Sequence, residues 1–112
     1  MTSDQKQLKW TTPRVHRRFI LDLRVVVRGP ETLHGRTKDI SEGGMGATIP
    51  GNLILGQIVQ LQLTLPDLNE NLIFTAELRY RQGFQYGFKF LHPTERQREI
   101  IRRITRDLPL AP

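Results

Sequence analysis

The stretch FTAELRYR at residues 74–81 alternates between apolar and polar side chains without a break. Successive side chains of a β-strand point to opposite faces, so the apolar members would share one face and the polar members the other. An antiparallel sheet with one face on a core and the other in water has this pattern. The stretch therefore predicts a half-buried strand in a mainly β fold.

The same alternation recurs on both sides of this stretch. Residues 19–27 are predicted as one strand that ends at Gly29-Pro30, with a core face formed by Phe19, Leu21, Leu23, Val25 and Val27. Further strands are predicted at residues 32–40, 45–49 and 59–65. A sixth strand covers residues 84–90, and its aromatic residues are assigned to the core because they share one face: Phe84, Tyr86, Phe88 and Phe90.

Near the C-terminus the pattern changes to a helical period. Thr94 and Gln97 fit a capping box, in which each side chain accepts a hydrogen bond from a backbone N–H that the first turn leaves free. A single apolar stripe follows, made of Ile100, Ile101, Ile104 and Leu108, and Pro109 ends it. We therefore expect a helix over about residues 94–108.

Six short strands and one amphipathic helix predict a six-stranded antiparallel β-barrel with the C-terminal α-helix covering its end or side. The barrel is expected over about residues 19–91, within one domain of residues 14–112. Residues 1–13 are polar and have no usable period, so they are predicted to form a flexible N-terminal arm. Trp10 is the arm residue best able to pack on the barrel or on a base.

Positive charge is concentrated at the two ends of the chain. The 112 residues carry a formal net charge of +6, from 17 Lys and Arg against 11 Asp and Glu. Residues 1–18 contain five of the basic residues and only Asp4 as an acid, whereas residues 19–92 are balanced. A surface that attracts anions is therefore expected at the arm and at the C-terminal helix.

Several classes of protein are disfavoured by what the sequence lacks. There is no cysteine, and the longest apolar runs are three residues, so disulfides, a membrane-spanning helix and a signal peptide are not expected. The three histidines have no metal-ligand spacing, and no carboxylate pair is suggested. We expect a cytoplasmic protein that is not an enzyme, has no metal or cofactor and does not insert into a membrane.

Two short motifs carry side chains suited to an anionic, base-bearing ligand. Arg14 and Arg18 lie four positions apart where the arm meets the first strand, and an arginine fork can bind a phosphate or the O6 and N7 acceptors of guanine. Asp39 and Ser41, just before Gly43-Gly44, can offer acceptors to a guanine edge while the glycines allow close backbone approach. A hairpin between them would bring the two motifs together.

Each motif also has an ordinary interpretation. The arginines could form a solvated basic turn, and Asp39 and Ser41 could form an Asx or Ser turn before the glycine pair. Taken separately, neither motif decides between these interpretations and ligand binding. Their order and their separation by one predicted strand and its return favour a shared site.

Together the motifs resemble those of the PilZ domain, a bacterial receptor module for cyclic di-GMP. Arg14 and Arg18 match its R-x-x-x-R motif, and Asp39, Ser41 and Gly44 match its [DN]-x-S-x-x-G motif. The segment 85–91 with the charged helix after it also resembles the end of these domains, so the likeness covers about residues 14–108. It implies a PilZ-type barrel that binds its ligand outside, between the arm and the 41–44 turn.

The resemblance also implies a role for each motif residue. Arg14 and Arg18 would contact phosphate and guanine, Asp39 and Ser41 the guanine edge, and Gly44 would keep the turn open. Arg17, Gly43 and Trp10 are auxiliary candidates. The ligand would be cyclic di-GMP, with no other cofactor.

The resulting hypothesis is an effector in bacterial second-messenger signalling, in which the ligand orders the arm on the barrel and an unidentified downstream protein reads the new surface. Two alternatives stay open: a small basic barrel that binds nucleic acid, which is less favoured because its aromatic residues are needed in the core, and a PilZ-like adaptor without a ligand. The sequence leaves open the stoichiometry and affinity of ligand binding, and whether the protein is a monomer or a weak dimer. It also leaves open which process the protein controls, such as motility, exopolysaccharide synthesis or virulence.

Overall fold

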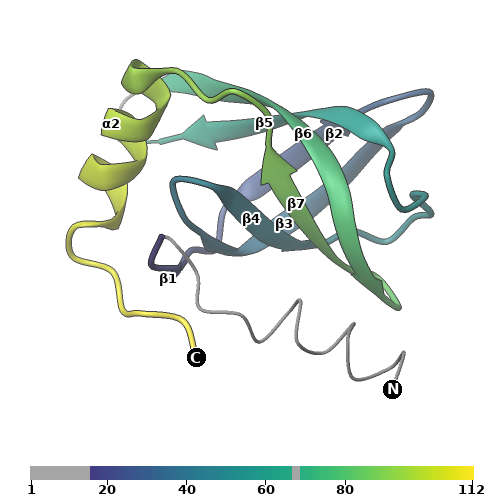
Figure 1. The fold of residues 1–112 in the computed structure, drawn as a ribbon, viewed down its shortest axis with the longest axis horizontal. Helices are drawn as coiled ribbons and strands as arrows, with labels where there is room; N and C mark the ends of the chain where they lie inside the picture. The colour runs from purple at the N-terminus through teal and green to yellow at the C-terminus, as the bar shows by residue number, and fades with distance from the viewer. Residues whose placement is uncertain (1–15, 67–68) are drawn as a thin grey trace.

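The computed structural model describes residues 16–66 and 69–112 (Figure 1). Its elements, in chain order, are β1 (Phe19–Ile20), β2 (Arg24–Arg28), β3 (Thr32–Ile40), β4 (Gly44–Thr48), β5 (Ile58–Leu65), β6 (Glu70–Gln82), β7 (Gln85–Phe90) and α2 (Glu95–Thr105). No helix among these residues is long and apolar enough to cross a membrane.

The strands close into a barrel in which every pairing is antiparallel. The hydrogen-bonded order is β1-β3-β2-β5-β6-β7-β4, and a further pairing of β3 with β4 closes the ring. Strand β1 lies outside this six-stranded ring and pairs with the end of β3, at Phe19–Ile40 and Ile20–Asp39. The predicted six-stranded antiparallel barrel with a C-terminal helix is confirmed, with one short strand added.

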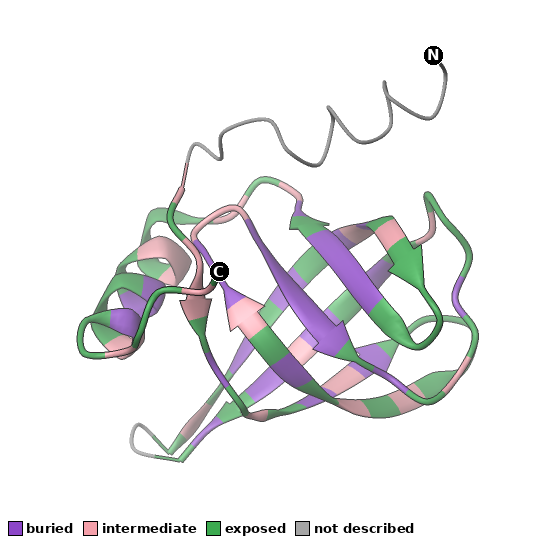
Figure 2. Ribbon diagram, turned by 90° about the horizontal axis from the view of Figure 1, so that it is seen from below, coloured by how far each residue is buried: buried purple, intermediate pink, exposed green. Residues whose placement is uncertain are grey.

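The core fills the barrel interior, as the alternating pattern predicted. Buried and exposed positions alternate along β5 and β6 (Figure 2). The rings of Phe74 and Phe90 stack with centroids 3.8 Å apart, and Tyr86 and Phe88 are buried beside them. The assignment of Phe84 to the core is wrong: it is 51% exposed, because the β6–β7 hairpin turns at Gly83, where φ is +61°, and leaves Phe84 outside β7.

The single strand predicted over residues 19–27 is instead broken into β1 and β2. The cause lies on β3, whose register shifts between Thr37 and Asp39. The Thr37 hydroxyl donates to the carbonyl of Leu21 at 2.7 Å and accepts from the amide of Leu23 at 2.8 Å, so a side chain takes part in the bonding between the two segments there. Such a bulge bends the strand that carries it, and here it lies opposite the segment between β1 and β2.

Helix α2 covers one end of the barrel and begins as predicted. The Thr94 side chain accepts from the Gln97 amide, and the Gln97 side chain accepts from the Thr94 amide, so the capping box is present. Ile100 and Ile101 are buried in the core. The helix ends at Thr105 rather than near residue 108, because a residue before a proline avoids the helical conformation and the chain turns ahead of Pro109.

Candidate functional site

A half-buried ion pair joins the two sequence motifs. The Arg18 guanidinium donates to Asp39 Oδ1 at 2.9 Å, and both side chains are 16% exposed. The pairing of β1 with the end of β3 places these residues side by side, although they are 21 positions apart in the chain. The amide of Gly46 donates to the same carboxylate oxygen at 3.0 Å. Asp39 therefore has a fixed position, with a cation on one side and a backbone donor on the other.

Ser41 shapes the turn between β3 and β4. Its hydroxyl oxygen accepts from the amides of Gly43 and Gly44 at 3.1 and 3.2 Å, and its amide donates to the Gly44 carbonyl at 2.8 Å. The side chain is largely enclosed, since the residue is only 5% exposed. These bonds form the Ser turn that the sequence offered as the ordinary interpretation of this motif. Much of the hydrogen-bonding capacity of the Ser41 hydroxyl is therefore used inside the turn.

The two glycines of this turn have different surroundings. A Cβ on Gly44 would lie 2.2 Å from the Phe88 carbonyl oxygen, because β4 and β7 approach each other closely there. A Cβ on Gly43 would lie 3.1 Å from Cδ2 of His16, which is a side chain. Gly44 is thus required by the packing of two strands, whereas a side chain at Gly43 would meet only the side chain of His16 and the Ser41 hydroxyl.

The C-terminal tail holds the backbone of Arg18, a contact that sequence patterns did not reveal. The Ala111 amide donates to the Arg18 carbonyl and the Ile20 amide donates to the Pro109 carbonyl, both at 2.9 Å. Phe19 and Leu110 form an isolated antiparallel bridge between these two bonds. The tail therefore adds a short strand beside β1, and it fixes the chain where the arm enters the domain.

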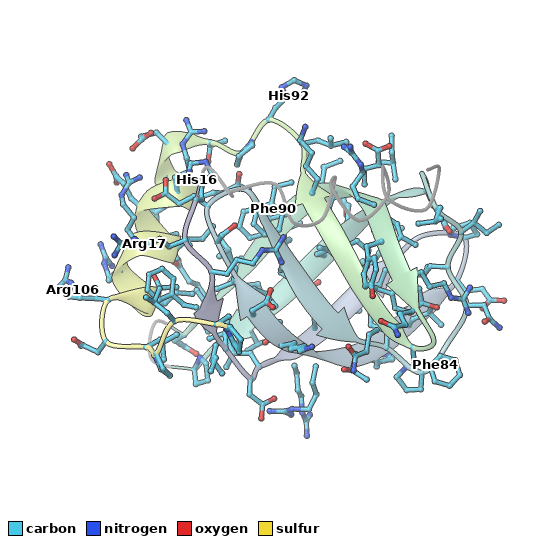
Figure 3. All side chains as sticks on the ribbon, turned by 60° about the horizontal axis from the view of Figure 1, so that its bottom comes forward. His16, Arg17, Phe84, Phe90, His92 and Arg106 are labelled. Carbon is cyan, nitrogen blue, oxygen red and sulfur yellow. The ribbon has the colours of Figure 1, made fainter. Side chains whose placement is uncertain are left out.

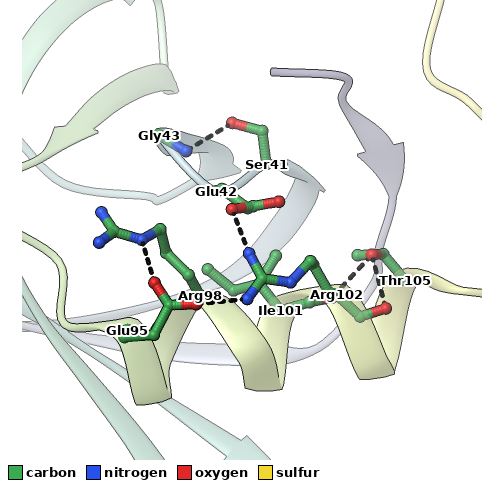
Figure 4. Close-up of polar contacts among 8 residues, drawn as sticks. All are labelled: Ser41, Glu42, Gly43, Glu95, Arg98, Ile101, Arg102 and Thr105. Carbon is green, nitrogen blue, oxygen red and sulfur yellow. Dashed lines mark hydrogen bonds and ion pairs between the residues drawn. The ribbon is translucent and has the colours of Figure 1, made fainter. Parts of the chain in front are cut away.

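Arg102 connects helix α2 to the 41–44 turn (Figure 4). Its guanidinium contacts Glu42 at 2.8 Å and Glu95 at 2.6 Å, and Arg98 contacts Glu95 at 3.3 Å. Hydrogen bonds from Arg102, and then from Arg98, lower the pKa of the Glu95 carboxyl below its ordinary value of 4.5. The hydrogen bond from Arg102 to Glu95 likewise raises the pKa of Arg102.

This network predicts a pH-dependent contribution of Glu95 to stability. Because the pKa of Glu95 is lowered in the folded state, its stabilising effect should be complete above 4.5 and should be lost as the pH falls through the folded-state pKa. Urea unfolding of the wild type and Glu95→Gln should differ at pH 7 and converge at low pH. Glu99→Gln, on the same helix, is the control, and a difference that does not change with pH would contradict the network.

A cleft of about 370 Å³ lies between the helix, the turn and the entry of the arm. It is lined by His16, Arg17, Phe19, Ser41, Glu42, Ile101, Arg102, Thr105 and Arg106. Three arginines and one carboxylate give this lining a net positive charge, which suits an anionic group. Figure 3 shows His16, Arg17 and Arg106 near the helix end of the molecule, whereas Phe84 lies at the far end.

The structure describes part of the predicted site. It brings Arg18, Asp39, Ser41, Gly43 and Gly44 to one end of the barrel, with Arg17 beside them. Arg14 and Trp10 lie outside the described residues. Within residues 16–66 and 69–112, no group of three His, Cys, Asp or Glu side chains could hold a metal ion. Sequence reasoning missed Gly46, whose signal was a third glycine close after the pair at 43 and 44.

The chain belongs to the PilZ domain family, whose model matches residues 12–107. The matched region begins before Arg14 and ends beyond helix α2, so it contains both sequence motifs and the barrel. Among curated proteins the comparison finds no match.

Solved structures share the fold. The PilZ domain of YcgR from Escherichia coli, determined with c-di-GMP, superposes with a TM-score of 0.73 at 22% identity, over 87% of this chain and 92% of that one. The PilZ domain of CeSA, from a cellulose-synthesizing bacterium, has a TM-score of 0.64 at 22% identity, over 79% and 93%. MotI/DgrA, the Bacillus subtilis inhibitor of motility, has 0.70 at 15%, over 84% of this chain but 49% of its own.

Proposed function

We propose that this protein is a receptor for cyclic di-GMP that acts in the cytoplasm without catalysing a reaction. The observation that carries the proposal is the half-buried Arg18–Asp39 pair, in which the two family motifs meet. Membership of the PilZ family supports it, as does the structural likeness to a YcgR domain with bound c-di-GMP. In this proposal residues 14–112 are the receptor domain and residues 1–13 the arm.

The chemistry of the pair matches that of the ligand. Cyclic di-GMP presents phosphates that need donors, guanine O6 and N7 atoms that accept from an arginine fork, and N1–H and N2 groups that need a carboxylate. Arg18 and Asp39 supply both kinds of partner, and Arg14 would add a second fork. Since only Oδ1 of Asp39 is used by Arg18 and Gly46, Oδ2 is the oxygen we assign to the guanine edge.

Isothermal titration of the purified protein with cyclic di-GMP tests the proposal, with GMP as the control ligand. We expect a Kd of about 1 μM or lower for cyclic di-GMP and much weaker binding of GMP. The measured stoichiometry would separate one bound ligand from a stacked pair. If cyclic di-GMP gives no heat of binding and does not compete for the protein, the proposal is wrong. Salt-dependent nucleic-acid binding and pull-down assays would then separate the two alternatives, a barrel that binds nucleic acid and an adaptor without a ligand.

The proposal includes a switch in which the ligand orders the arm. Arg14 belongs to the arm side of the first motif and Arg18 is held by β3 and the tail, so a phosphate bridging the two would draw the preceding residues onto the barrel. The new surface would be read by a downstream protein. Both the contact with Arg14 and the identity of that protein belong to the proposal.

Trp10 provides a direct measurement of this switch, since it is the only tryptophan of the chain. We expect its fluorescence to change and amide exchange of residues 1–13 to slow at saturating cyclic di-GMP, because an ordered arm shields both. GMP should produce neither effect. Binding without any change in these two signals would show that the ligand does not order the arm.

A further inference from the structure

The cleft at the helix end of the barrel lies on the other side of the first strand from the proposed ligand site. Arg17 and Phe19 line the cleft. Arg18, which lies between them in the chain, contacts Asp39 instead. This alternation is typical of an extended segment, whose successive side chains point to opposite sides. The two sites are therefore distinct, although they share one segment of backbone.

A carboxylate already contacts an arginine in this cleft. Glu42, in the 41–44 turn, is one of the lining residues, and its carboxylate lies 2.8 Å from the Arg102 guanidinium (Figure 4). Arg102 also contacts Glu95 at 2.6 Å, so two acidic side chains of the same chain neutralise its charge. The pair shows which chemical group the lining of this cleft binds.

Two other arginines of the lining lack such a partner. Within residues 16–66 and 69–112, neither Arg17 nor Arg106 forms an ion pair, and both are exposed. Arg106 follows the last residue of α2 and Arg17 precedes β1, so two separate elements bring them to one cleft (Figure 3). Two planar donor forks without an acceptor suit further carboxylates from outside the domain.

The shape and lining of the cleft favour a segment of a protein over a small molecule. Its volume is about 370 Å³, and apart from the polar groups it is lined by Phe19 and Ile101. Small-molecule sites enclose most of their ligand, whereas this cleft has arginines exposed at its rim, Arg102 by 46%. An acidic side chain with an apolar neighbour matches this lining, because the carboxylate can reach the arginines while the apolar side chain contacts the Phe19 ring.

The N-terminal sequence of the chain has the wrong charge for this cleft. Residues 1–15 contain Asp4 as their only acid, against three basic residues: Lys6, Lys9 and Arg14. Like charges repel, so a segment with this composition is disfavoured beside Arg17 and Arg106. The occupant that matches the cleft by charge is therefore an acidic segment of another protein.

We propose that this cleft is the docking site for an acidic segment of the downstream protein, whose carboxylates are bound by Arg17 and Arg106. The inference rests on the proposed function, which supplies the downstream protein. His16 and Arg17 follow the arm directly and line the cleft, so a ligand that draws the arm onto the barrel also acts on the lining of the docking site. Ligand binding and docking are thus coupled through neighbouring residues.

A labelled peptide of alternating glutamate and leucine tests the inference by fluorescence anisotropy, with a peptide of alternating lysine and leucine as the control. Arg17→Glu and Arg106→Glu should each bind the acidic peptide roughly tenfold more weakly or worse, because each loses charge-assisted hydrogen bonds and gains a repulsion. Arg103→Glu is the matched control. Arg103 is an exposed arginine in the last turn of the same helix but does not line the cleft, so its variant should bind nearly as the wild type does.

NMR of the wild-type protein provides a second measurement that needs no variant. The acidic peptide should shift the amide signals of Arg17 and Arg106, and it should leave Phe84 at the far end of the barrel unchanged. Absence of peptide binding, or shifts confined to other residues, would overturn the inference.

Two further results of the variant experiment would also overturn it. An equal loss of affinity in Arg103→Glu and Arg106→Glu would show that only the net charge of the helix matters. Tighter binding of a labelled single-stranded DNA, lost in Arg106→Glu, would make the cleft a nucleic-acid site instead. Failure of the proposed function is seen separately, as absence of cyclic di-GMP binding to the wild type, whereas Arg106→Glu should bind cyclic di-GMP as the wild type does.

Discussion

Replacing Arg18 by alanine should reduce the affinity for cyclic di-GMP by about 100-fold or more, because the substitution removes the donor fork from the centre of the proposed site. Each hydrogen bond from a charged donor contributes about 1.5–3 kcal/mol, so the loss of two of them gives an effect of this size. The neighbouring Arg17→Ala, which removes an exposed cation of the same type, should have a much smaller effect. Titration of both variants measures the difference.

The Arg18 variant needs a control for stability, since it also leaves Asp39 without its cation. Both side chains are 16% exposed, and removal of one partner should lower the free energy of unfolding by about 1–2 kcal/mol. The double variant Arg18→Ala with Asp39→Ala removes the lone carboxylate and should recover part of that stability, but it should not recover binding. If Arg18→Ala binds cyclic di-GMP as tightly as Arg17→Ala does, Arg18 is not a ligand-binding residue.

Local patterns in the sequence were sufficient to predict most of the barrel. Alternation identified the strand at residues 59–65, and the capping box identified the start of the helix, because both signals depend on neighbours in the chain. The break after Ile20 was missed because its cause is Thr37, a residue on another strand. The exposure of Phe84 was missed because a strand pattern does not show where a hairpin turns.

The same distinction applies to the site. Arg18 and Asp39 were expected to lie together because one strand and its return separate them, and the structure brings them within 2.9 Å. The contacts of Gly46 and Ala111 depend on register between segments that are distant in the chain, for which the sequence contains no local signal. A family motif thus identifies the residues at the centre of a site more readily than those that position them.

Gly44 illustrates this limit, and its replacement by alanine should destabilise the fold by about 3 kcal/mol or more. The new Cβ would lie 2.2 Å from the carbonyl oxygen of Phe88, and that backbone atom cannot move without separating β4 from β7. Gly43→Ala is the matched control in the same turn. Its Cβ would lie 3.1 Å from the His16 side chain, which can move aside, so we expect a loss of less than about 1 kcal/mol.

Urea unfolding of the two variants separates two possible roles of Gly44, the last position of the motif. If Gly44 is needed for strand packing, Gly44→Ala should have a much lower unfolding midpoint than Gly43→Ala, and its weaker binding should follow from the unfolded fraction. If Gly44 instead keeps the turn open for the ligand, as the resemblance alone implied, Gly44→Ala should be as stable as Gly43→Ala and still fail to bind. The approach of Phe88 to Gly44 favours the first result, in which Gly44 would affect the proposed ligand site only through the strand that it allows to pack.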